Sequence, residues 1–305
     1  MIKVLSFYKF MELRDPPAER ELLLSKGQQL LLKGTILVAG EGLNGTLVGT
    51  EATLANMQVL LTERYGEIPF KWSSIDAENP GFYRYKVKLK TEIVSFGVEN
   101  LDMAQNGEHV DATRWNELLD DPNVVVIDAR NQYEVDIGTF AAAVTPQTTN
   151  FREFPDWVDG HMDPEEQKEV AMFCTGGIRC EKASAYMLKL GFEKVYQLNG
   201  GILAYLEEVR DDSNRWQGEC FVFDQRVSVT SKLEQGRYQQ CYACRHPISQ
   251  AQLSSADYEE GVSCPHCIDD LDATRRAQFR ERQRQVDLAE ARGEQHVGAP
   301  SGTQN

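Results

Sequence analysis

The stretch that decides the fold of the central part of this chain reads Val170-Ala-Met-Phe-Cys174-Thr-Gly-Gly-Ile-Arg179-Cys180. A short apolar run stops at a cysteine, and a tight loop with two glycines leads into an expected helix. Backbone N–H groups of such a loop converge on the sulfur, and the positive end of the helix adds to their effect. Arg179 adds a fixed positive charge, and cysteines in such surroundings have pKa values of about 3.5–7.5. The pattern predicts a reactive thiolate at Cys174; the alternative is a small buried cysteine beside a glycine turn.

Strand-like and helix-like segments alternate on both sides of this loop. Val124-Val-Val-Ile-Asp128 is a continuous apolar run, typical of a strand buried in a parallel sheet. Ligands of such sheets bind at the carboxyl ends of the strands, where Asp128 and Cys174 both fall. The pattern therefore predicts an α/β domain. The expected strands are 124–128, 170–173 and 194–198, and the expected helices are 111–119, 164–168, 181–190 and 202–210.

The first hundred residues predict a second, α+β fold. Their order is strand, helix, strand, strand, helix, strand, which is the βαββαβ order of a ferredoxin-like or acylphosphatase-like sandwich. The glycine-rich segment 40–45 between the two middle strands predicts a hairpin turn, with a phosphate-binding loop as the alternative. The expected strands are 4–10, 35–39, 46–48 and 70–74, and the expected helices are 16–33 and 51–65.

A basic strand is expected in Phe82-Tyr-Arg-Tyr-Lys-Val-Lys-Leu-Lys-Thr91. Side chains alternate along a strand, so the two sets of residues lie on opposite faces. Four aligned cations favour contact with a phosphate backbone, whereas the alternative is an edge strand protected by lysines. The cations are Arg84, Lys86, Lys88 and Lys90, and the residues expected to face a core are Tyr83, Tyr85, Val87 and Leu89.

Length and composition indicate a soluble protein of two or three domains. The chain has 305 residues, of which 41% are hydrophobic and 26% charged. No apolar run approaches the length that crosses a bilayer, and the first residues predict a strand and not a secretory signal. Seven cysteines, four of them in Cys-x-x-Cys pairs, suit a reducing compartment. We therefore expect a cytoplasmic protein.

The net charge of −15 is unevenly distributed. Residues 1–97 carry 12 basic and 11 acidic side chains (+1), residues 98–215 carry 10 and 23 (−13), and residues 216–305 carry 10 and 13 (−3). The acidity is concentrated in the middle segment, and both flanks are nearly neutral. The total charge therefore does not exclude a nucleic-acid partner.

Two cysteine pairs near the C-terminus have the spacing of a metal site. Cys241-Tyr-Ala-Cys244 and Cys264-Pro-His-Cys267 are separated by 19 residues, as in structural Zn²⁺ sites with four thiolates. The surrounding stretch is too short and polar for an adequate core, which a bound metal would compensate. Unpaired or redox cysteines and an iron–sulfur cluster are the alternatives. We expect His246 and His266 to lie beside the site and not to act as ligands.

Five segments follow from these patterns. They are a ferredoxin-like domain at 1–97, a linker at 98–108, an α/β domain at 109–215, a cysteine-rich zinc-binding-like region at 216–270, and a basic helix with a disordered tail at 271–305. The helix is expected at 273–285 and carries five arginines, which predict either a local basic patch or a solvated surface helix. The tail is expected at 298–305.

The spacing Cys174-x4-Arg179 alone admits three kinds of protein. A sulfurtransferase would carry a persulfide on Cys174, and a phosphatase would hold a phosphoryl group in the same loop. Phosphatase loops of this type are generally one residue longer, and an inactive regulatory domain usually lacks the cysteine. The loop by itself favours sulfur chemistry.

The central segment resembles a rhodanese domain. The matching residues are Trp115, Leu118-Leu119, Asp121-Pro122, Val125 to Arg130, Tyr133-Glu134, Cys174, Arg179 and Leu198 to Tyr205. One departure is Gly138-Thr-Phe140, where the common rhodanese pattern has Gly-His-Ile. No histidine is therefore available at that position.

Up to about residue 270, the chain as a whole resembles the rhodanese-containing tRNA uridine(34) hydroxylases. The matching stretches are 39–46, 86–94, 174–184, 218–224 and the two cysteine pairs. The resemblance implies an oxidoreductase that hydroxylates the wobble uridine of tRNA to 5-hydroxyuridine, with O2 as co-substrate and Cys174 as the essential residue. Arg179 is expected as the second catalytic residue, with active-site support from Asp128, Arg130, Thr175, Gly176, Gly177, Ile178 and Cys180.

The implied partner is tRNA, and neither a membrane nor a stable protein partner is inferred. No flavin, haem or nicotinamide fingerprint is found in the sequence. Cys174 either adds to C6 of the uracil or is oxidised to a sulfenic acid, and Cys180 either resolves that acid or is a packed residue. A rhodanese-type sulfurtransferase with a persulfide on Cys174 is the alternative function. An RNA-binding scaffold with a vestigial rhodanese loop is the second alternative.

Overall fold

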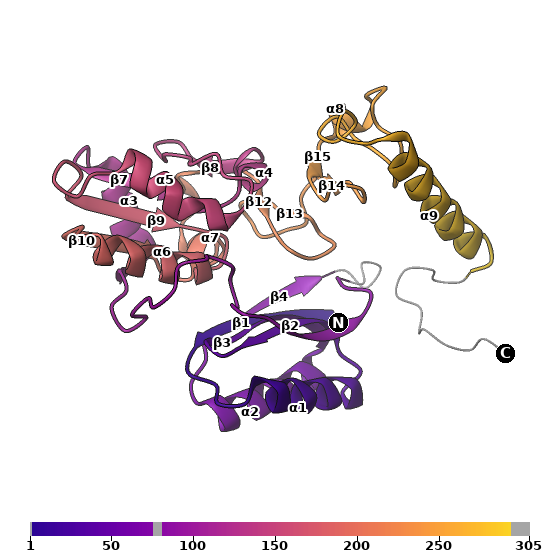
Figure 1. Cartoon of the computed structure of the whole chain (residues 1–305), viewed down its shortest axis with the longest axis horizontal. Helices are drawn as coiled ribbons and strands as arrows, with labels where there is room; N and C mark the ends of the chain where they lie inside the picture. Colours follow the sequence, from indigo (N-terminus) through magenta and orange to yellow (C-terminus); the bar gives the residue numbers. More distant parts are fainter. Residues whose placement is uncertain (1, 76–80, 294–305) are drawn as a thin grey trace.

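An N-terminal sheet with two helices, a central α/β unit and a cysteine-rich C-terminal region make up the computed structural model (Figure 1). The structure describes residues 2–75 and 81–293. Within these residues, no helix combines the length and apolar character needed to cross a membrane.

The N-terminal sheet has five strands in the order β4-β1-β3-β2-β5. All neighbouring strands are antiparallel except β2 and β5, which are parallel. The βαββαβ order is confirmed, and β5 adds an edge strand to it. The elements are β1 (Ile2–Phe10), α1 (Pro16–Gln29), β2 (Lys33–Ala39), β3 (Gly42–Thr50), α2 (Glu51–Tyr65), β4 (Phe70–Ile75) and β5 (Tyr85–Leu89).

Only one face of this sheet is covered by helices. The side chain of Asp15 caps α1, and that of Thr50 caps α2, each by accepting a backbone N–H of the first turn. Alternate strand residues pack on these helices, so the opposite face of the sheet is left for another part of the chain. The core between sheet and helices includes Leu5, Phe7, Leu23, Ile36, Leu43, Leu47, Leu54 and Leu61.

The predicted hairpin between β2 and β3 is confirmed, but its turn is shorter than expected. Ala39 already pairs with Gly42, so residues 42–45 belong to the sheet. At Gly42, φ is 139°, and a Cβ atom would lie 2.0 Å from the carbonyl oxygen of Lys9. The close approach of two strands explains the glycine there.

The central unit has a parallel sheet in the order β6-β10-β9-β7, as the rhodanese-like pattern predicts. Its two faces bury separate apolar clusters, around Trp115 and Phe173 on one side and around Phe154 and Met187 on the other. The elements are β6 (Glu108–Val110), α3 (Ala112–Asp120), β7 (Val124–Asp128), α4 (Gln132–Val135), β8 (Gly138–Phe140), α5 (Phe154–His161), β9 (Glu169–Phe173), α6 (Ile178–Lys189), β10 (Lys194–Leu198) and α7 (Gly201–Glu208).

The helix expected at 164–168 is wrong. These residues form turns, and the helix lies earlier in the chain, at α5. Phe154 and Val158 of α5 are fully buried, whereas 164–168 has no large apolar side chain to bury. Burial decides the position of the helix here.

The C-terminal region consists of short strand pairs and one long helix. β11 (Trp216–Gly218) pairs with β8 and so ties this region to the central unit. The basic helix, expected at 273–285, extends as α9 over Ala273–Ala291, and the tail expected at 298–305 lies outside the described residues. The other elements are β12 (Cys220–Phe221), β13 (Ser228–Val229), β14 (Gln239–Gln240), β15 (Pro247–Ile248) and α8 (Gln250–Leu253).

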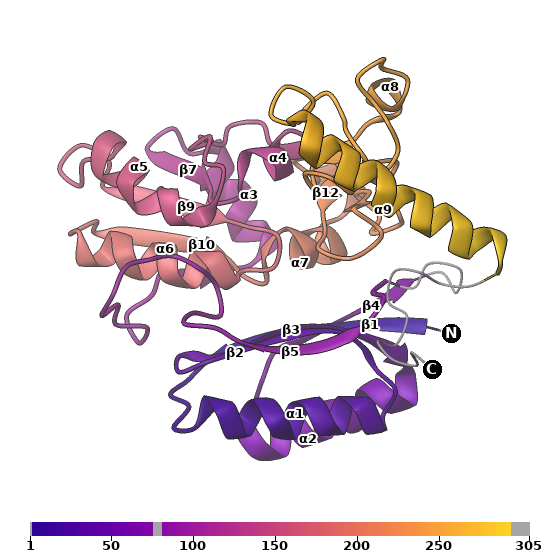
Figure 2. The same cartoon turned by 45° about the vertical axis from the view of Figure 1, so that its right-hand side comes forward.

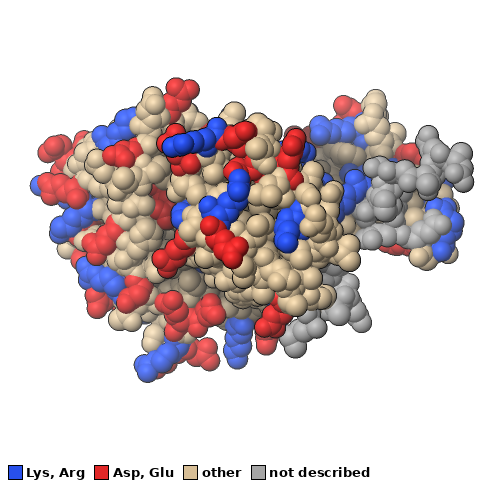
Figure 3. Space-filling view, turned by 90° about the horizontal axis from the view of Figure 1, so that it is seen from below, with Lys and Arg blue, Asp and Glu red and all other residues tan. Residues whose placement is uncertain are grey.

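The helix-free face of the N-terminal sheet is turned toward α6 and the loop before it (Figures 1 and 2). The segment between β5 and β6 runs between the two parts. Lys182 of α6 forms ion pairs with Glu41 at 2.8 Å and with Glu92 at 2.6 Å. On the opposite side, where α1 and α2 lie, acidic and basic side chains are intermixed (Figure 3).

Candidate active site

The loop after β9 wraps its backbone around the sulfur of Cys174. The N–H of Gly177 donates a hydrogen bond to Sγ at 3.1 Å. The carbonyl groups of Cys174 and Thr175 point the other way and accept N–H groups of Ile202 and Leu203 at 3.0 and 3.2 Å. The first turn of α7 thereby fixes the loop with its N–H groups directed inward.

Cys174 has the electrostatic surroundings of a thiolate. Burial alone would raise its pKa, because the side chain is fully enclosed. The Cys180 thiol, the charge of Arg179 and the backbone N–H groups of residues 179 and 180 outweigh this and lower the pKa to about 5. Cys180 is itself buried, which raises its pKa, so it stays a thiol and donates to Cys174.

Arg179 is not a free charge. Its two terminal nitrogens bind the carboxylate of Glu134 at 2.6 and 2.7 Å, and both side chains are buried. The pair keeps the pKa of Glu134 below its ordinary value, although burial alone would raise it. Thr175 also donates to Glu134 at 3.2 Å, so the glutamate holds two loop residues in place.

Asp128 and Arg130 form a second buried ion pair, with contacts of 2.6 and 2.8 Å. Thr139, at the position of the missing histidine, donates to Asp128 at 2.8 Å. Arg130 also binds the carbonyl oxygen of Gly138 at 2.6 Å and lies over the ring of Trp216. This pair connects the end of β7 with β8 and with Trp216 of the C-terminal region, and so supports the active site indirectly.

A cavity of about 1110 Å³ lies between the Cys174 loop and the helix-free face of the N-terminal sheet. Pockets that bind small molecules usually measure about 300–1,000 Å³. All three parts of the chain and the segment after β5 contribute to the walls. The lining residues include Ser6, Tyr8, Phe10, Asn44, Thr46, Lys71, Phe82, Lys90, Phe151, Cys174, Thr175, Gly176, Ile178, Arg179, Phe223 and Arg226.

Tyr8 of β1 lies directly over the loop. Its hydroxyl donates to Glu181 at 3.0 Å, and a Cβ atom on Gly177 would come within 2.9 Å of it. Burial raises the pKa of Tyr8, so the hydroxyl stays protonated. His109 also contacts Glu181, at 3.1 Å. Glu181 therefore joins the loop helix to the N-terminal sheet and to the start of β6.

The basic strand takes the expected alternation in part. Lys86 and Lys88 are exposed opposite Thr35 and Leu37, on the helix-free face, and Val87 is buried in the core. Leu89 is 44% exposed, so its expected burial is wrong, because the strand leaves the core at its end. Arg84 and Lys90 are exposed as well, and of the four cations Lys90 lines the cavity. RNA contact by these residues stays a prediction.

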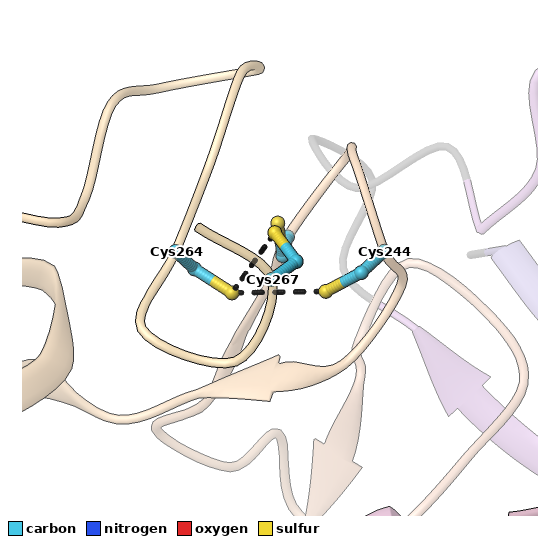
Figure 4. Close-up of side chains that lie close together, drawn as sticks. Cys244, Cys264 and Cys267 are labelled. Atoms are coloured by element: carbon cyan, nitrogen blue, oxygen red, sulfur yellow. Dashed lines mark hydrogen bonds between the residues drawn. The ribbon is translucent and has the colours of Figure 1, made fainter. Parts of the chain in front are cut away.

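The four C-terminal cysteines come together as their spacing predicts. Their sulfur atoms all lie within 4.8 Å of one another, with Cys264 at 3.6 Å from Cys244 and 3.8 Å from Cys267 (Figure 4). Sulfur ligands at about 2.3 Å from a tetrahedral zinc ion are roughly 3.8 Å apart, so the cluster fits Zn²⁺. His246 contacts the Cys244 sulfur at 3.3 Å and would orient it beside a metal.

The arginines of α9 are largely engaged within the protein. Arg280 binds Glu259 at 2.6 Å, and Arg282 binds the carbonyl oxygen of Gly261 at 2.6 Å. These contacts attach α9 to the cysteine-rich region. They favour the surface-helix interpretation over a free basic patch.

Sequence reasoning missed three residues of the site as contributors: Tyr8, Lys71 and Glu134. Glu134 stood in the rhodanese-like motif but was given no role. Tyr8 and Lys71 lie about 100 residues or more before the loop, and only the packing of the two parts reveals them. The one sequence signal for a role of these two residues is that each is polar and lies on the strand face opposite the apolar core residues.

Comparisons with known families agree with this architecture. A family model described as the UPF0176 acylphosphatase-like domain matches residues 2–93, and one for the rhodanese-like domain matches residues 111–208. This chain belongs to the UPF0176 rhodanese-containing family. A rhodanese domain suggests sulfurtransferase-like catalytic activity.

Solved structures similar to parts of this UPF0176-family chain were also found. A rhodanese-like domain from Anabaena sp. is 18% identical, covers 36% of this chain and 78% of its own, and has a TM-score of 0.30. A rhodanese-related protein from Thermoplasma volcanium is 18% identical, with 33% and 92% covered and a TM-score of 0.26. A protein from Rhodopseudomonas palustris described as a possible tyrosine phosphatase is 20% identical, with 33% and 80% covered and a TM-score of 0.28.

Proposed function

We propose that this protein modifies tRNA by oxygen-dependent 5-hydroxylation of uridine at wobble position 34, with Cys174 as the reactive group. The observation that carries the proposal is the cavity of about 1110 Å³ in front of the Cys174 loop. A rhodanese that serves a small sulfur donor has no need of so large a space. A nucleotide turned out of an RNA loop fits the size, because single-stranded RNA is recognised through unstacked bases.

The walls of the cavity suit a nucleobase. Phe10, Phe82, Phe151 and Phe223 supply aromatic surface, on which bases stack. Lys86 and Lys88 are exposed on the same sheet face, and Lys90 belongs to the cavity wall. Cations placed there would hold the phosphates of the same RNA.

The proposed chemistry begins with the thiolate of Cys174. Its sulfur forms a bond to C6 of uracil, and the electron pair of the C5–C6 double bond moves toward the C4 carbonyl, which makes C5 nucleophilic. Net hydroxylation consumes one O2, two electrons and two protons and releases one water. The electrons come from a two-electron reductant, which we propose to be a dithiol. C5 forms a bond to one oxygen atom of O2, and the dithiol becomes a disulfide as the other oxygen atom is reduced to water. Loss of the C5 proton then re-forms the double bond and releases the sulfur from C6.

The test uses purified protein, a tRNA lacking the modification, a dithiol and O2 carrying a heavy oxygen isotope. Mass spectrometry of the nucleosides should show 5-hydroxyuridine with the heavy oxygen, and Cys174→Ala should abolish it. Formation of the product without label, or equal yield from the variant, would refute the proposal.

Persulfide transfer is the second candidate, favoured by the inward N–H of Gly177 and the pKa of about 5 at Cys174. Such a loop would also stabilise a persulfide anion. Under this reading, thiosulfate should sulfurate Cys174, and cyanide should then release thiocyanate without any tRNA. Turnover of these small molecules in the absence of hydroxylation would replace the first proposal with the second.

A further inference from the structure

The two arginines of the rhodanese domain near the Cys174 loop are both neutralised. Arg179 binds Glu134 and Arg130 binds Asp128, each through two contacts of 2.6–2.8 Å between buried side chains. A close pair of opposite charges exerts a much weaker field than a single charge. The field that Arg179 exerts on the thiolate is therefore weaker than that of an unpaired arginine, although it still lowers the pKa of Cys174.

Lys71 of β4 reaches the same loop from the N-terminal domain. Its Nζ donates to the carbonyl oxygen of Gly176 at 2.8 Å and to that of Gly200. Both acceptors are neutral, and no carboxylate of the described residues forms an ion pair with Lys71. Lys182, by contrast, is paired with two glutamates. Lys71 thus brings an unpaired positive charge to the loop and lines the cavity together with Cys174.

We propose that Lys71 is a second cation, besides Arg179, that stabilises the Cys174 thiolate, so that the N-terminal domain completes the active site of the rhodanese domain. Two hydrogen bonds fix the ammonium group in place, and a pre-positioned charge stabilises an anion without reorganisation. Burial lowers the pKa of Lys71 to about 8, and the charge of Cys174 opposes this. The ammonium form therefore predominates at neutral pH. Lys71 acts through Cys174, so it is a positioning residue.

The other ionisable groups named here around Cys174 and Lys71 are paired, neutral or negatively charged. From α6 come Arg179, which is paired, and Cys180, which is a neutral thiol. From β1 comes the protonated phenol of Tyr8, with Glu181 behind it. Glu207 and Glu208 of α7 support the charged form of Lys71. Lys71 is the cation in this group that lacks a carboxylate contact among the described residues.

The test is a pH titration of the Cys174 thiolate by its ultraviolet absorbance, taken as the difference between the protein and its Cys174→Ala variant. No tRNA is present, so the result does not depend on the proposed function. The blank for Lys71→Met is the double variant that also carries Cys174→Ala. In Lys71→Met the midpoint of the Cys174 titration should rise by roughly one pH unit, which is about a tenfold loss of thiolate below the midpoint. Lys71→Arg keeps the charge and should stay within a few tenths of a unit.

Lys3→Met serves as the matched control, because it removes a lysine from β1 on the other face of the same sheet. Its midpoint should not move. Should Lys71→Met fail to fold, as judged by circular dichroism, Lys71→Gln retains a donor without charge and should give the same upward shift. An unchanged midpoint in either neutral variant, or an equal shift in Lys71→Arg, would overturn the proposal.

Discussion

At the scale of single residues, the geometry of the Cys174 loop depends on the carboxylate of Glu134. Glu134 binds Arg179 and Thr175, and it is fully buried. Removing one member of a buried ion pair leaves an uncompensated charge and typically costs about 3–5 kcal/mol. We therefore expect Glu134→Gln to lower the free energy of unfolding by about that amount in denaturant titrations.

The control for this prediction is Glu117→Gln. Glu117 pairs with Arg114 on the surface, where solvent screens the charges and such pairs contribute little to stability. A loss in Glu134→Gln no larger than in Glu117→Gln would show that the buried pair does not hold the loop.

His109 makes the stability of the protein depend on pH. Its hydrogen bond to Glu181 raises the pKa of His109 above the ordinary value of 6.5, although burial opposes this. A raised pKa in the folded state stabilises the protein below the unfolded pKa, and the contribution is lost as pH rises through the folded pKa. His109→Gln should remove this decline from unfolding midpoints measured on either side of neutral pH. A decline of equal size in the variant would exclude His109 as its origin.

The reactive loop was predictable from sequence because all its parts are local. The strand, the cysteine, the glycines and the helix follow one another within about a dozen residues, and their order determines the direction of the N–H groups. The pairing of Arg179 was not predictable in this way. Glu134 comes from another element 45 residues earlier, and only tertiary packing places it there.

At the scale of elements, β5 and Lys90, the residue after it, carry the proposed RNA contact. Lys86, Lys88 and Lys90 changed together to Glu should weaken tRNA binding by tenfold or more and flatten its salt dependence, since each phosphate contact releases counterions. The measurement is a binding titration at several salt concentrations.

The matched control changes Lys3, Arg14 and Lys26 to Glu, which alters the charge of the same domain by the same amount away from the cavity. Binding should hardly change in this variant. Equal tRNA affinity in the two triple variants would rule out a specific role for β5.

Element order proved predictable where periodicity and burial agree. The helix α2 was expected at 51–65 and forms there, because Leu54, Met57 and Leu61 give it one apolar face. The expected helix at 164–168 failed since helix-forming residues without an apolar face gain nothing from packing. The same reason explains why the helix forms earlier in the chain than expected, as α5, where it buries Phe154.

At the scale of the whole molecule, the cysteine cluster is expected to hold the C-terminal region together. The core around it is small, consisting of Cys241, Ile248, Cys264 and Cys267 with a few partly buried neighbours. We expect one zinc ion per chain by elemental analysis. Chelation or Cys264→Ser should raise hydrogen exchange at 239–271 and leave the sheet of the rhodanese domain protected. Unchanged exchange after chelation would contradict a structural metal.

The arrangement of the domains could not be read from the sequence. Local sequence patterns predict the fold of each domain, but they do not predict that the helix-free sheet face packs against the Cys174 loop. Tyr8, Lys71 and Lys182 create that interface over separations of about 90 to 170 residues. Because of this long-range packing, the Cys174 loop forms one wall of a large cavity to which several parts of the chain contribute.

The most direct test of the central claim is nucleoside mass spectrometry of tRNA from cells whose own copy of this protein is replaced by the wild type or by Cys174→Ala. Equal protein amounts are verified by immunoblot. The account predicts 5-hydroxyuridine at the wobble position with the wild type and none with the variant. Retention of the modification in cells carrying Cys174→Ala would contradict the account.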